Sequence, residues 1–403
     1  LHMLRFDGED GSPIGLIMVH SAHGTLFDPD DRNLSRDVVG GFEDKVAESF
    51  DTPVEVFFLQ AGAGDMSPAD APYDTDGEIP VIPNDCNRIE ALGNVAAELV
   101  QGAFWDIETD DDVAIRSQRH YIPLGRDIMG YEDGVFPFDG GGAYCGSTID
   151  SECWTGEPTP IEGLDKACLD IEMLAGGMGI EETAPDRTMV NASLIGDLLL
   201  MTYPGEPVTQ CTLDVEEGIR TIFPEQEKII VLGYSQDYVG YSVPEWDFYQ
   251  GGYEASGALW GPKQGDHITA HAIEIGRALL EGKDDVPFDD PGPFPISDTA
   301  GATFQDSYCI DAGTVVTEPA SNVVAGETVL FEFTGGSPWL LLPTVVLEKE
   351  VDGDFQPVTR PNGTVVDSLG YEFFISMDPE PSYKDNLAIK KRTFTWRFQL
   401  PTD

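Results

Sequence analysis

Four apolar runs in the first 250 residues each lead into a side chain that could do chemistry. The run IGLIMV leads to His23, VEVFFL to Ser67, LIGDLLLMTY to Glu206, and KIIVLGY, through SQDYVG, to Tyr241. Runs this apolar predict strands buried on both faces, and ligands bind beyond the carboxyl ends of parallel strands. We therefore expect an imidazole, a hydroxyl, a carboxylate and a phenol to converge on one site.

The spacing of these residues leaves three interpretations open. In the first, a histidine and a glutamate bind a metal with tyrosine as an unusual oxygen ligand, and the cation polarises a carbonyl or activates a hydroxyl. In the second, Ser67 is a nucleophile with a histidine base and an acidic residue that orients it. Its loop, FFLQAGAGDMSP, lacks the GxSxG pattern of a nucleophile elbow. In the third, these are ordinary turn residues.

The composition restricts the class of partner. The chain has 403 residues and a formal net charge of −51, from 73 Asp and Glu against 22 Lys and Arg. That charge repels nucleic acid and anionic membrane surfaces, so nucleic-acid binding is excluded. The acidic residues stand in short clusters such as FDPDDRN, which predict solvated loops, with calcium sites or a salty habitat as the alternatives.

The cysteines indicate an oxidising location. Six are present without a CxxC pair, and Cys145 and Cys153 flank a loop that a short disulfide could close, with Cys168 able to compete for either. We expect a secreted or cell-surface, extracytoplasmic protein, with six unrelated buried thiols as the alternative. No run reaches the roughly 18 continuous apolar residues of a transmembrane helix.

The pattern along the chain predicts two domains. Residues 1–285 mix short apolar strands with helical periodicity, which indicates an α/β (mixed α+β) body. Its clearest helix, GDHITAHAIEIGRALLEGK, should end at Gly282, and His271 lies on its apolar stripe without an assigned role. Residues 286–295 form a linker rich in Pro and Asp. Residues 296–403 read as strands, with a turn at Asp352-Gly353 and alternation in TFTWRFQL, and predict a β-sandwich.

Four segments, in this order along the chain, resemble the neutral/alkaline (non-lysosomal) ceramidase family. They are SAHGTLFDPDDRNLSRD, FFLQAGAGDMSP, YPGEPVTQ and DYVGYSVPEWDFYQGGYEASGALWGPKQGDHI. The resemblance covers residues 4–282, with the family's immunoglobulin-like domain as the counterpart of residues 296–403. It implies a zinc-dependent amidohydrolase that cleaves ceramide to sphingosine and a fatty acid in a deep apolar pocket. Calcium stays a further candidate cation, which the acidic clusters alone suggest.

The resemblance also implies a role for particular residues. The histidine of AHGT, the glutamate of PGE and the tyrosine of VGYSVPE correspond to zinc ligands of the family, here His23, Glu206 and Tyr241. Whether the serine attacks the amide or orients a water that attacks is left open.

The remaining implied roles belong to the serine loop and to a second tyrosine. Ser67 matches the family's catalytic serine, and Tyr253, in GGYEAS, matches a tyrosine that hydrogen-bonds near the reacting carbonyl. Gly64 and Asp65 are expected to shape the serine loop, and Pro68 to hold the following backbone extended.

The chain departs from the family at one motif. The family's first zinc histidine lies in an HxHSGP motif, which this sequence lacks. Because LHMLRFDGED reads as the middle of a strand, we expect the amino-terminal part of the catalytic domain to be missing and to associate with this chain. Two other functions stay open: a zinc hydrolase of another acyl amide or ester, and a non-catalytic surface or binding protein that retains the fold. The aromatic, glycine-rich segment YEDGVFPFDGGGAY is a candidate lip of a lipid pocket, with a packed surface loop as the alternative.

Overall fold

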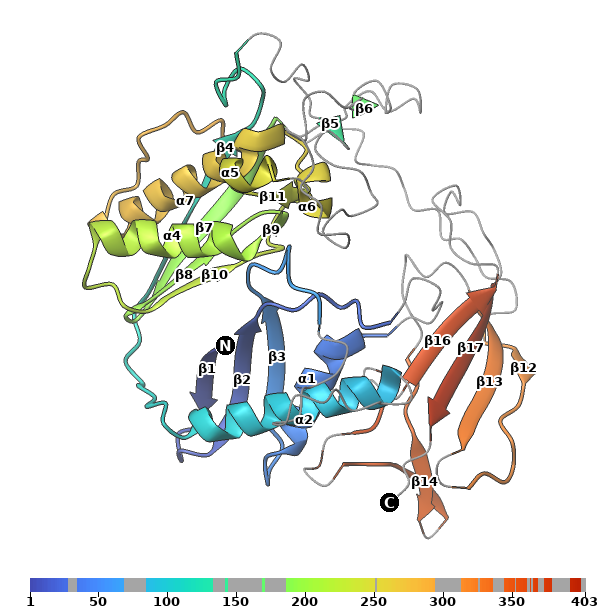
Figure 1. The fold of residues 1–403 in the computed structure, drawn as a ribbon. Coiled ribbons are helices and arrows are strands. Elements are labelled where there is room, and N and C mark those ends of the chain that lie inside the picture. The colour runs from blue at the N-terminus through green and yellow to red at the C-terminus, as the bar shows by residue number, and fades with distance from the viewer. Residues whose placement is uncertain are drawn as a thin grey trace, which may run out of the picture.

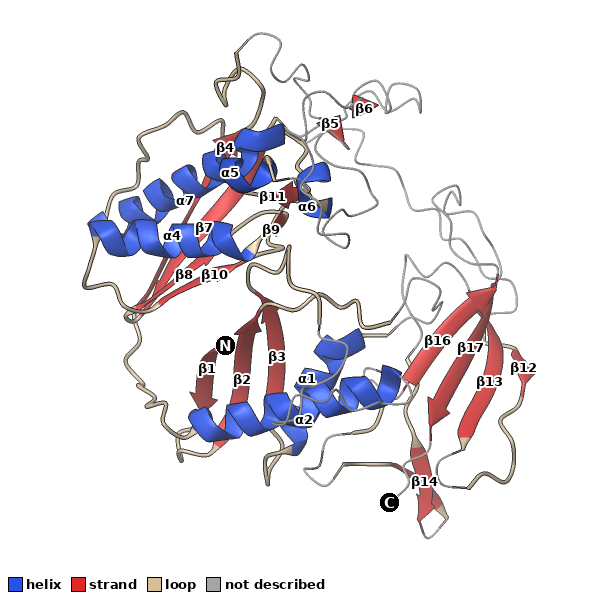
Figure 2. Ribbon diagram, viewed as in Figure 1, coloured by secondary structure: helices blue, strands red, loops and turns tan. Residues whose placement is uncertain are grey.

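The computed structural model is a mixed α and β structure, as the sequence predicts (Figures 1 and 2). The part of the chain that it describes comprises residues 1–27, 35–68, 85–132, 142–143, 169–170, 186–250, 252–293, 313–324, 327–335, 344–351, 353–360, 363, 365–368, 373–378 and 392–399. Two helix-covered sheets form the amino-terminal three quarters of this part, and an antiparallel sheet forms the rest.

The first sheet has three strands in the order β1-β2-β3. Its strands are β1 (His2–Asp7), β2 (Pro13–His20) and β3 (Glu55–Gln60), and it is mixed, since β1 runs antiparallel to β2 and β3 runs parallel to it. Helices α1 (Asp37–Glu48) and α2 (Asp85–Phe104) cover one face, onto which β2 directs Leu16 and Met18.

The second sheet has four strands in the order β10-β8-β7-β4. These are β4 (Ile115–Pro123), β7 (Arg187–Ile195), β8 (Leu198–Thr202) and β10 (Ile229–Leu232); only β10 and β8 pair in parallel. Helices α4 (Thr209–Ile222) and α7 (Gln264–Glu281) cover the face that carries Leu199, Met201 and Val231. Helix α7 ends at Gly282 in the left-handed conformation, as predicted.

The uncovered faces of the two sheets meet each other. Val19 of β2 packs with Ile230 and Leu232 of β10, and the partly buried residues around them come from both sheets. Because side chains alternate between the faces of a strand, each sheet packs its helices on one side and the other sheet on the other. The layers are therefore helix, sheet, sheet and helix.

Two features of this arrangement differ from the sequence-based expectation. The run LIGDLLLMTY, taken as one strand, is a hairpin whose turn lies at Gly196-Asp197, between the antiparallel strands β7 and β8. Gly196 has a φ of +60°, which a glycine adopts without strain. The four apolar runs also lie in two separate mixed sheets, in which β2 pairs in parallel with β3 and β8 with β10.

The carboxyl-terminal region forms an antiparallel sheet in the order β12-β13-β17-β16. Phe394, Trp396 and Phe398 of β17 are buried, which confirms the alternation predicted there. A separate hairpin turns between Val351 and Asp354, as predicted. The bounds are β12 (Val315–Thr317), β13 (Thr328–Gly335), β14 (Glu348–Val351), β15 (Asp354–Pro357), β16 (Phe373–Asp378) and β17 (Arg392–Gln399).

The carboxyl-terminal region contacts the first helical layer through a buried ion pair. Arg360 is 8% exposed, and its Nε lies 3.0 Å from Oε1 of Glu48 on α1. The immunoglobulin-like assignment and the domain limits remain predictions.

Some sequence-based expectations fall outside the described residues. Cys145, Cys153 and Cys168 lie there, and so does most of the candidate lip, whose described ends are residues 131–132 and 142–143. Within the described part, Cys211 is a buried free thiol. No helix of that part is long and apolar enough to span a bilayer.

Candidate functional site

His23 stands three residues beyond the end of β2, on a short loop that Gln60 holds. The side chain of Gln60, the last residue of β3, accepts a hydrogen bond from the Ala22 N–H at 3.1 Å and donates another to the Ala22 carbonyl. The backbone N–H of His23 donates to the Met66 carbonyl at 2.8 Å. The histidine loop and the serine loop, which follow neighbouring parallel strands, are therefore bonded to each other.

The serine loop closes tightly against the second sheet because of Gly64. The Gly64 N–H donates to the Pro207 carbonyl at 2.8 Å, and a Cβ on Gly64 would lie 2.8 Å from the Glu206 carbonyl oxygen. Asp65 accepts hydrogen bonds at 2.8 Å from both the backbone N–H and the hydroxyl of Thr209, the first residue of α4. A loop of the first sheet thus satisfies a free N–H group at the start of a helix of the second.

Two short parallel strands bring Glu206 and Tyr241 side by side. They are β9 (Glu206–Pro207) and β11 (Tyr241–Ser242), which pair with Tyr241 directly opposite Glu206. The chain enters β9 through Gly205, whose φ is +67° and where a Cβ would lie 2.3 Å from the Gly240 carbonyl oxygen. Only glycine fits this crossing, so the PGE sequence is a geometric requirement as well as a resemblance.

Four side chains surround the Glu206 carboxylate. His23 Nε2 lies 3.0 Å from Oε2, and the Tyr234 hydroxyl lies 3.2 Å from the same oxygen and 3.0 Å from His23 Nε2. The Tyr238 hydroxyl donates to Oε1 at 2.7 Å. Tyr241 lies directly opposite Glu206 across β9 and β11, and its phenol lowers the pKa of this carboxyl. The predicted ligands His23, Glu206 and Tyr241 therefore come together, although 183 residues separate the first two.

The surroundings of the site lower the pKa of Glu206 and raise those of His23 and Tyr241. Burial raises the pKa of the Glu206 carboxyl, but the hydrogen bonds from His23, Tyr238 and Tyr241 outweigh burial and lower it to about 2. The hydrogen bond to Glu206 raises the pKa of His23, against the effect of burial. Burial and the nearby carboxylate raise the pKa of the phenol of Tyr241. Glu206 is thus a carboxylate at neutral pH, held by phenols that keep their protons.

The donor set fits a metal ion of the kind that the resemblance implies. The His23 imidazole and the Glu206 carboxylate meet at 3.0 Å, Tyr241 lies opposite Glu206 on the paired strand, and zinc takes nitrogen and oxygen ligands of these kinds. A cluster of three or more His, Cys, Asp or Glu residues is absent from the described residues. Tyr241 is the oxygen donor that the first interpretation of the sequence adds to His23 and Glu206.

The two predicted catalytic residues lie beside this cluster. Ser67 is exposed and follows Met66, whose carbonyl accepts the His23 N–H; its Oγ lies 3.5 Å from the Thr25 hydroxyl oxygen. Tyr253 begins the short helix α6 (Tyr253–Ser256), and its ring meets that of Tyr241 edge to face, with 5.6 Å between centroids. Pro68 is half-buried at the end of the described loop.

Tyr234 and Tyr238, which carry no predicted role, also lie against Glu206. Both stand in the stretch GYSQDYVGY, in which three tyrosines fall within eight residues. Such a density of phenols after a buried strand is a signal that could have drawn attention to them. The backbone φ of +54° that turns Tyr234 toward the site has no local signature in a bulky residue.

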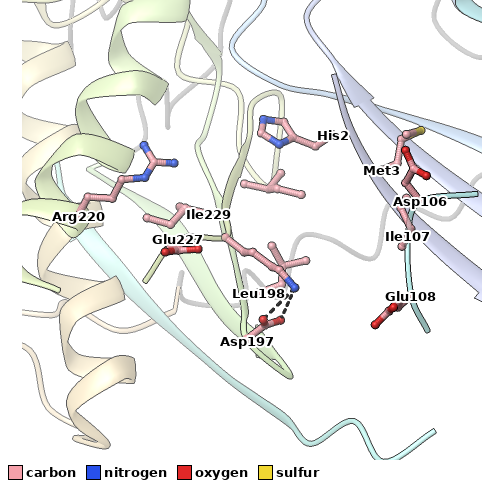
Figure 3. A pocket seen from close by; sticks show the side chains of 12 residues that line it. His2, Met3, Asp106, Ile107, Glu108, Asp197, Leu198, Arg220, Glu227 and Ile229 are labelled. Carbon is pink, nitrogen blue, oxygen red and sulfur yellow. Dashed lines mark hydrogen bonds and ion pairs between the residues drawn. The ribbon is translucent and has the colours of Figure 1, made fainter. Parts of the chain in front are cut away.

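A separate hollow lies between the sheets, away from this cluster (Figure 3). Its volume is about 650 Å³, and Leu198 and Ile229, which begin β8 and β10, line it together with His2 of β1. Glu206 and Tyr234 come after the opposite ends of β8 and β10. The hollow contains an ion pair between Lys228 and Asp197, and no residue of the candidate site lines it.

Comparisons with known sequences give two similar curated proteins. Neutral ceramidase B of Dictyostelium discoideum is 24% identical over 235 residues, which are 53% of this chain and 32% of that protein. Neutral ceramidase of Drosophila pseudoobscura pseudoobscura is 25% identical over 251 residues, which are 54% of this chain and 35% of that protein. The chain thus matches about a third of the length of each relative. No family model matches the chain.

Comparisons with solved structures support the same likeness at the level of the fold. A ceramidase complexed with C2 gives a TM-score of 0.66 at 16% identity, over 99% of this chain and 66% of that one. Neutral ceramidase from Pseudomonas aeruginosa gives 0.62 at 16% identity, over 99% and 65%. The resemblance to neutral ceramidases that the four sequence segments indicate is confirmed.

Proposed function

We propose that the chain provides the catalytic site of a zinc-dependent amidohydrolase that cleaves the N-acyl amide of ceramide to sphingosine and a fatty acid. The observation that carries the proposal is the meeting of His23, Glu206 and Tyr241 beside the loop of Ser67 and the ring of Tyr253. The likeness to ceramidases selects the substrate class among the amides and esters that such a site could cleave.

The residues of the chain divide the work of amide hydrolysis. Bound zinc supplies Lewis acidity toward the amide carbonyl. His23, Glu206 and Tyr241 would hold the ion, and the Tyr253 hydroxyl would donate a hydrogen bond to the oxygen on which negative charge develops. Ser67 either attacks the carbonyl carbon, which leads to an acyl-enzyme, or orients the water that attacks. Its loop is fixed by Gly64 and Asp65, so the backbone that carries the serine is in place before the substrate arrives.

Exposed apolar groups around the site favour a lipid substrate. Tyr238 is 66% exposed, Tyr253 50% and Met66 37%, and all three adjoin the cluster around Glu206. A chain of charge −51 gains nothing from anionic headgroups, so these apolar surfaces, or calcium ions that bridge like charges, would contribute to docking. We also propose that the protein is secreted or at the cell surface, with a disulfide between Cys145 and Cys153 or between one of them and Cys168.

The decisive experiment measures hydrolysis of an N-acylsphingosine before and after zinc removal by chelation. Activity that disappears with the metal and returns with added zinc supports the proposal, and full turnover by protein shown to be zinc-free contradicts it. Mass spectrometry of the enzyme during turnover separates the two roles of Ser67, because an acyl adduct on the serine is incompatible with attack by water.

The same assay tests the alternatives. Turnover of simple acyl esters or peptides, but not of N-acylsphingosines, would favour a hydrolase of another acyl compound. Failure of every substrate, with the zinc site intact, would favour a binding protein that keeps the fold. The association with an amino-terminal portion that carries HxHSGP is a further part of the proposal, and intact mass with amino-terminal sequencing of the natural material tests it.

A further inference from the structure

Tyr234 is held at the candidate site by its backbone and by its hydroxyl. It follows β10 and Gly233, its N–H donates to the Gly205 carbonyl at 2.9 Å, and its ring meets the His23 ring edge to face with 5.7 Å between centroids. Its hydroxyl oxygen lies 3.0 Å from His23 Nε2 and 3.2 Å from Glu206 Oε2. The phenol therefore contacts two of the three residues of the proposed metal site, His23 and Glu206.

The backbone of Tyr234 is strained in a way that suits a functional residue. Its φ of +54° lies in the left-handed region, which is an outlier for a bulky side chain and costs conformational energy. Glycine would adopt the same conformation without strain. A tyrosine here is explained by the place to which this conformation takes its hydroxyl, since strained conformations of this kind cluster at active sites and ligand clamps.

The three polar atoms have the spacing of metal ligands. The separations between His23 Nε2, Glu206 Oε2 and the Tyr234 hydroxyl oxygen are 3.0, 3.0 and 3.2 Å. Ligands at about 2.0–2.2 Å from a tetrahedral zinc ion are about 3.3–3.6 Å apart. These three atoms would therefore have to move apart by only a few tenths of an ångström to hold one ion in common.

We propose that Tyr234 is a fourth protein ligand of the ion, together with His23, Glu206 and Tyr241. The inference rests on the proposed zinc site and adds a donor to the three that the family resemblance assigns. Binding the ion would release the phenol proton to solvent and leave an oxygen ligand. The chain would thus offer one nitrogen and three oxygen donors, all from described residues.

Tyr238 has a different role in this arrangement. Its hydroxyl binds the other carboxylate oxygen, Oε1, at 2.7 Å, and no hydrogen bond to His23 is recorded for it among the described contacts. It therefore orients the Glu206 carboxylate from outside, as the partners of metal ligands commonly do.

The first experiment measures zinc affinity of the full chain by competition with a chromophoric chelator. Tyr234→Phe keeps the ring and removes only the hydroxyl, and we expect at least about a tenfold weaker affinity. Tyr121→Phe is the matched control, since Tyr121 lies on β4, which contributes no residue to the site, and its affinity should equal that of the unmodified chain. An unchanged affinity of Tyr234→Phe would overturn the proposal.

A second measurement distinguishes a ligand from a residue that only positions the others. The cupric form should show a charge-transfer absorption from two coordinated phenolates, which Tyr234→Phe and Tyr241→Phe should each reduce and the double variant should abolish. A band in Tyr234→Phe as strong as in the unmodified chain shows that Tyr234 does not bind the ion. Tyr234→Gly relieves the backbone strain, so a weak zinc affinity in this well-folded variant would exclude misfolding as the cause.

These readouts also separate this inference from the proposed function. If the chain binds zinc through both tyrosines yet cleaves no N-acylsphingosine, the metal site stands and the ceramidase proposal fails. If Tyr234→Phe binds zinc as tightly as the unmodified chain and the chain cleaves ceramide, the ceramidase proposal stands and the fourth ligand fails.

Discussion

The sheet β10-β8-β7-β4 and the sheet β12-β13-β17-β16 both have four strands, yet only the first leads into a cluster of reactive groups. In the first, β8 and β10 run parallel, so Glu206 and Tyr234 follow their ends at the same edge. In the second, every recorded strand pair is antiparallel, and successive strand ends lie at opposite edges. Two sheets with the same number of strands therefore differ in where their strand ends lie. Side chains that follow neighbouring parallel strands can meet, and those that follow neighbouring antiparallel strands cannot.

The largest effect should come from the core of the carboxyl-terminal sheet and leave the site unaffected. Trp396 is 4% exposed and packs edge to face on Phe373. Trp396→Ala should lower the free energy of unfolding by about 3–5 kcal/mol, because a large cavity forms. Chemical denaturation measures this loss, with Val316→Ala on exposed β12 as a control expected within about 0.5 kcal/mol of the parent. A parallel loss of zinc affinity in folded Trp396→Ala would contradict the independence of the two sheets.

The next effect concerns the carboxylate at the end of β8. Glu206→Gln removes the negative charge and keeps the size of the side chain, so we expect at least about a hundredfold loss of N-acylsphingosine turnover, equivalent to about 2.7 kcal/mol. Glu332→Gln is the matched control in the other sheet, where Glu332 accepts hydrogen bonds from Thr317 and Thr395. Equal activities of the two variants would contradict the assignment of the catalytic site to the end of β8.

A smaller effect should appear in the pH dependence of stability, through a histidine that packs against the sheet β10-β8-β7-β4. Burial, and to a lesser degree the nearby His271, lowers the pKa of His267 on α7 to about 4, although its Nε2 lies 2.9 Å from the Pro123 carbonyl oxygen of β4. The folded state therefore binds this proton less readily than the unfolded state, and stability falls as the pH drops from the unfolded value of about 6.5 toward 4.

This pH dependence has a direct test. The His267 contribution should weaken the fold by roughly 2 kcal/mol between about pH 7 and about pH 5. His267→Gln, which can still donate to Pro123, should show a correspondingly smaller loss when both proteins are unfolded with urea at the two pH values. Identical losses in the two proteins would show that His267 is not the group responsible.

The smallest effect should come from the bond between the serine loop and α4. Asp65→Ala leaves the Thr209 N–H without its carboxylate partner, and we expect a loss of about 1 kcal/mol in stability. Asp65→Asn keeps an acceptor oxygen and should lose less. Thermal unfolding measures both, and a loss in Asp65→Asn as large as that in Asp65→Ala would show that charge, not hydrogen bonding, stabilises this contact.

The sequence was informative wherever the information was local. The apolar stripe of residues 265–283 predicts α7 and its end at Gly282, and the alternation around Trp396 predicts β17. The order of four segments indicates the family, and each leads to a residue of the cluster around Glu206 or of the loop bonded to it.

What escaped prediction depends on contacts between distant segments. Periodicity does not show which strands pair, so the division into two sheets and the hairpin at Gly196-Asp197 were not foreseen. The positive φ of Tyr234 depends on its packing near Gly205 and His23, which lie far from it in the sequence. Its place at the site is therefore a property of the tertiary structure.

The origin of the proposed ligands in two separate sheets has a consequence for unfolding. His23 follows a strand of the sheet β1-β2-β3, and Glu206 follows a strand of the sheet β10-β8-β7-β4. The two sheets also meet in the cluster around Val19 and through the hydrogen bonds of the serine loop to Pro207 and Thr209. An ion bound by both residues would cross-link the two halves, and binding to the folded state alone would stabilise them jointly. Saturation with zinc should merge their melting into one cooperative transition, whereas the metal-free chain should begin to open where the two sheets touch.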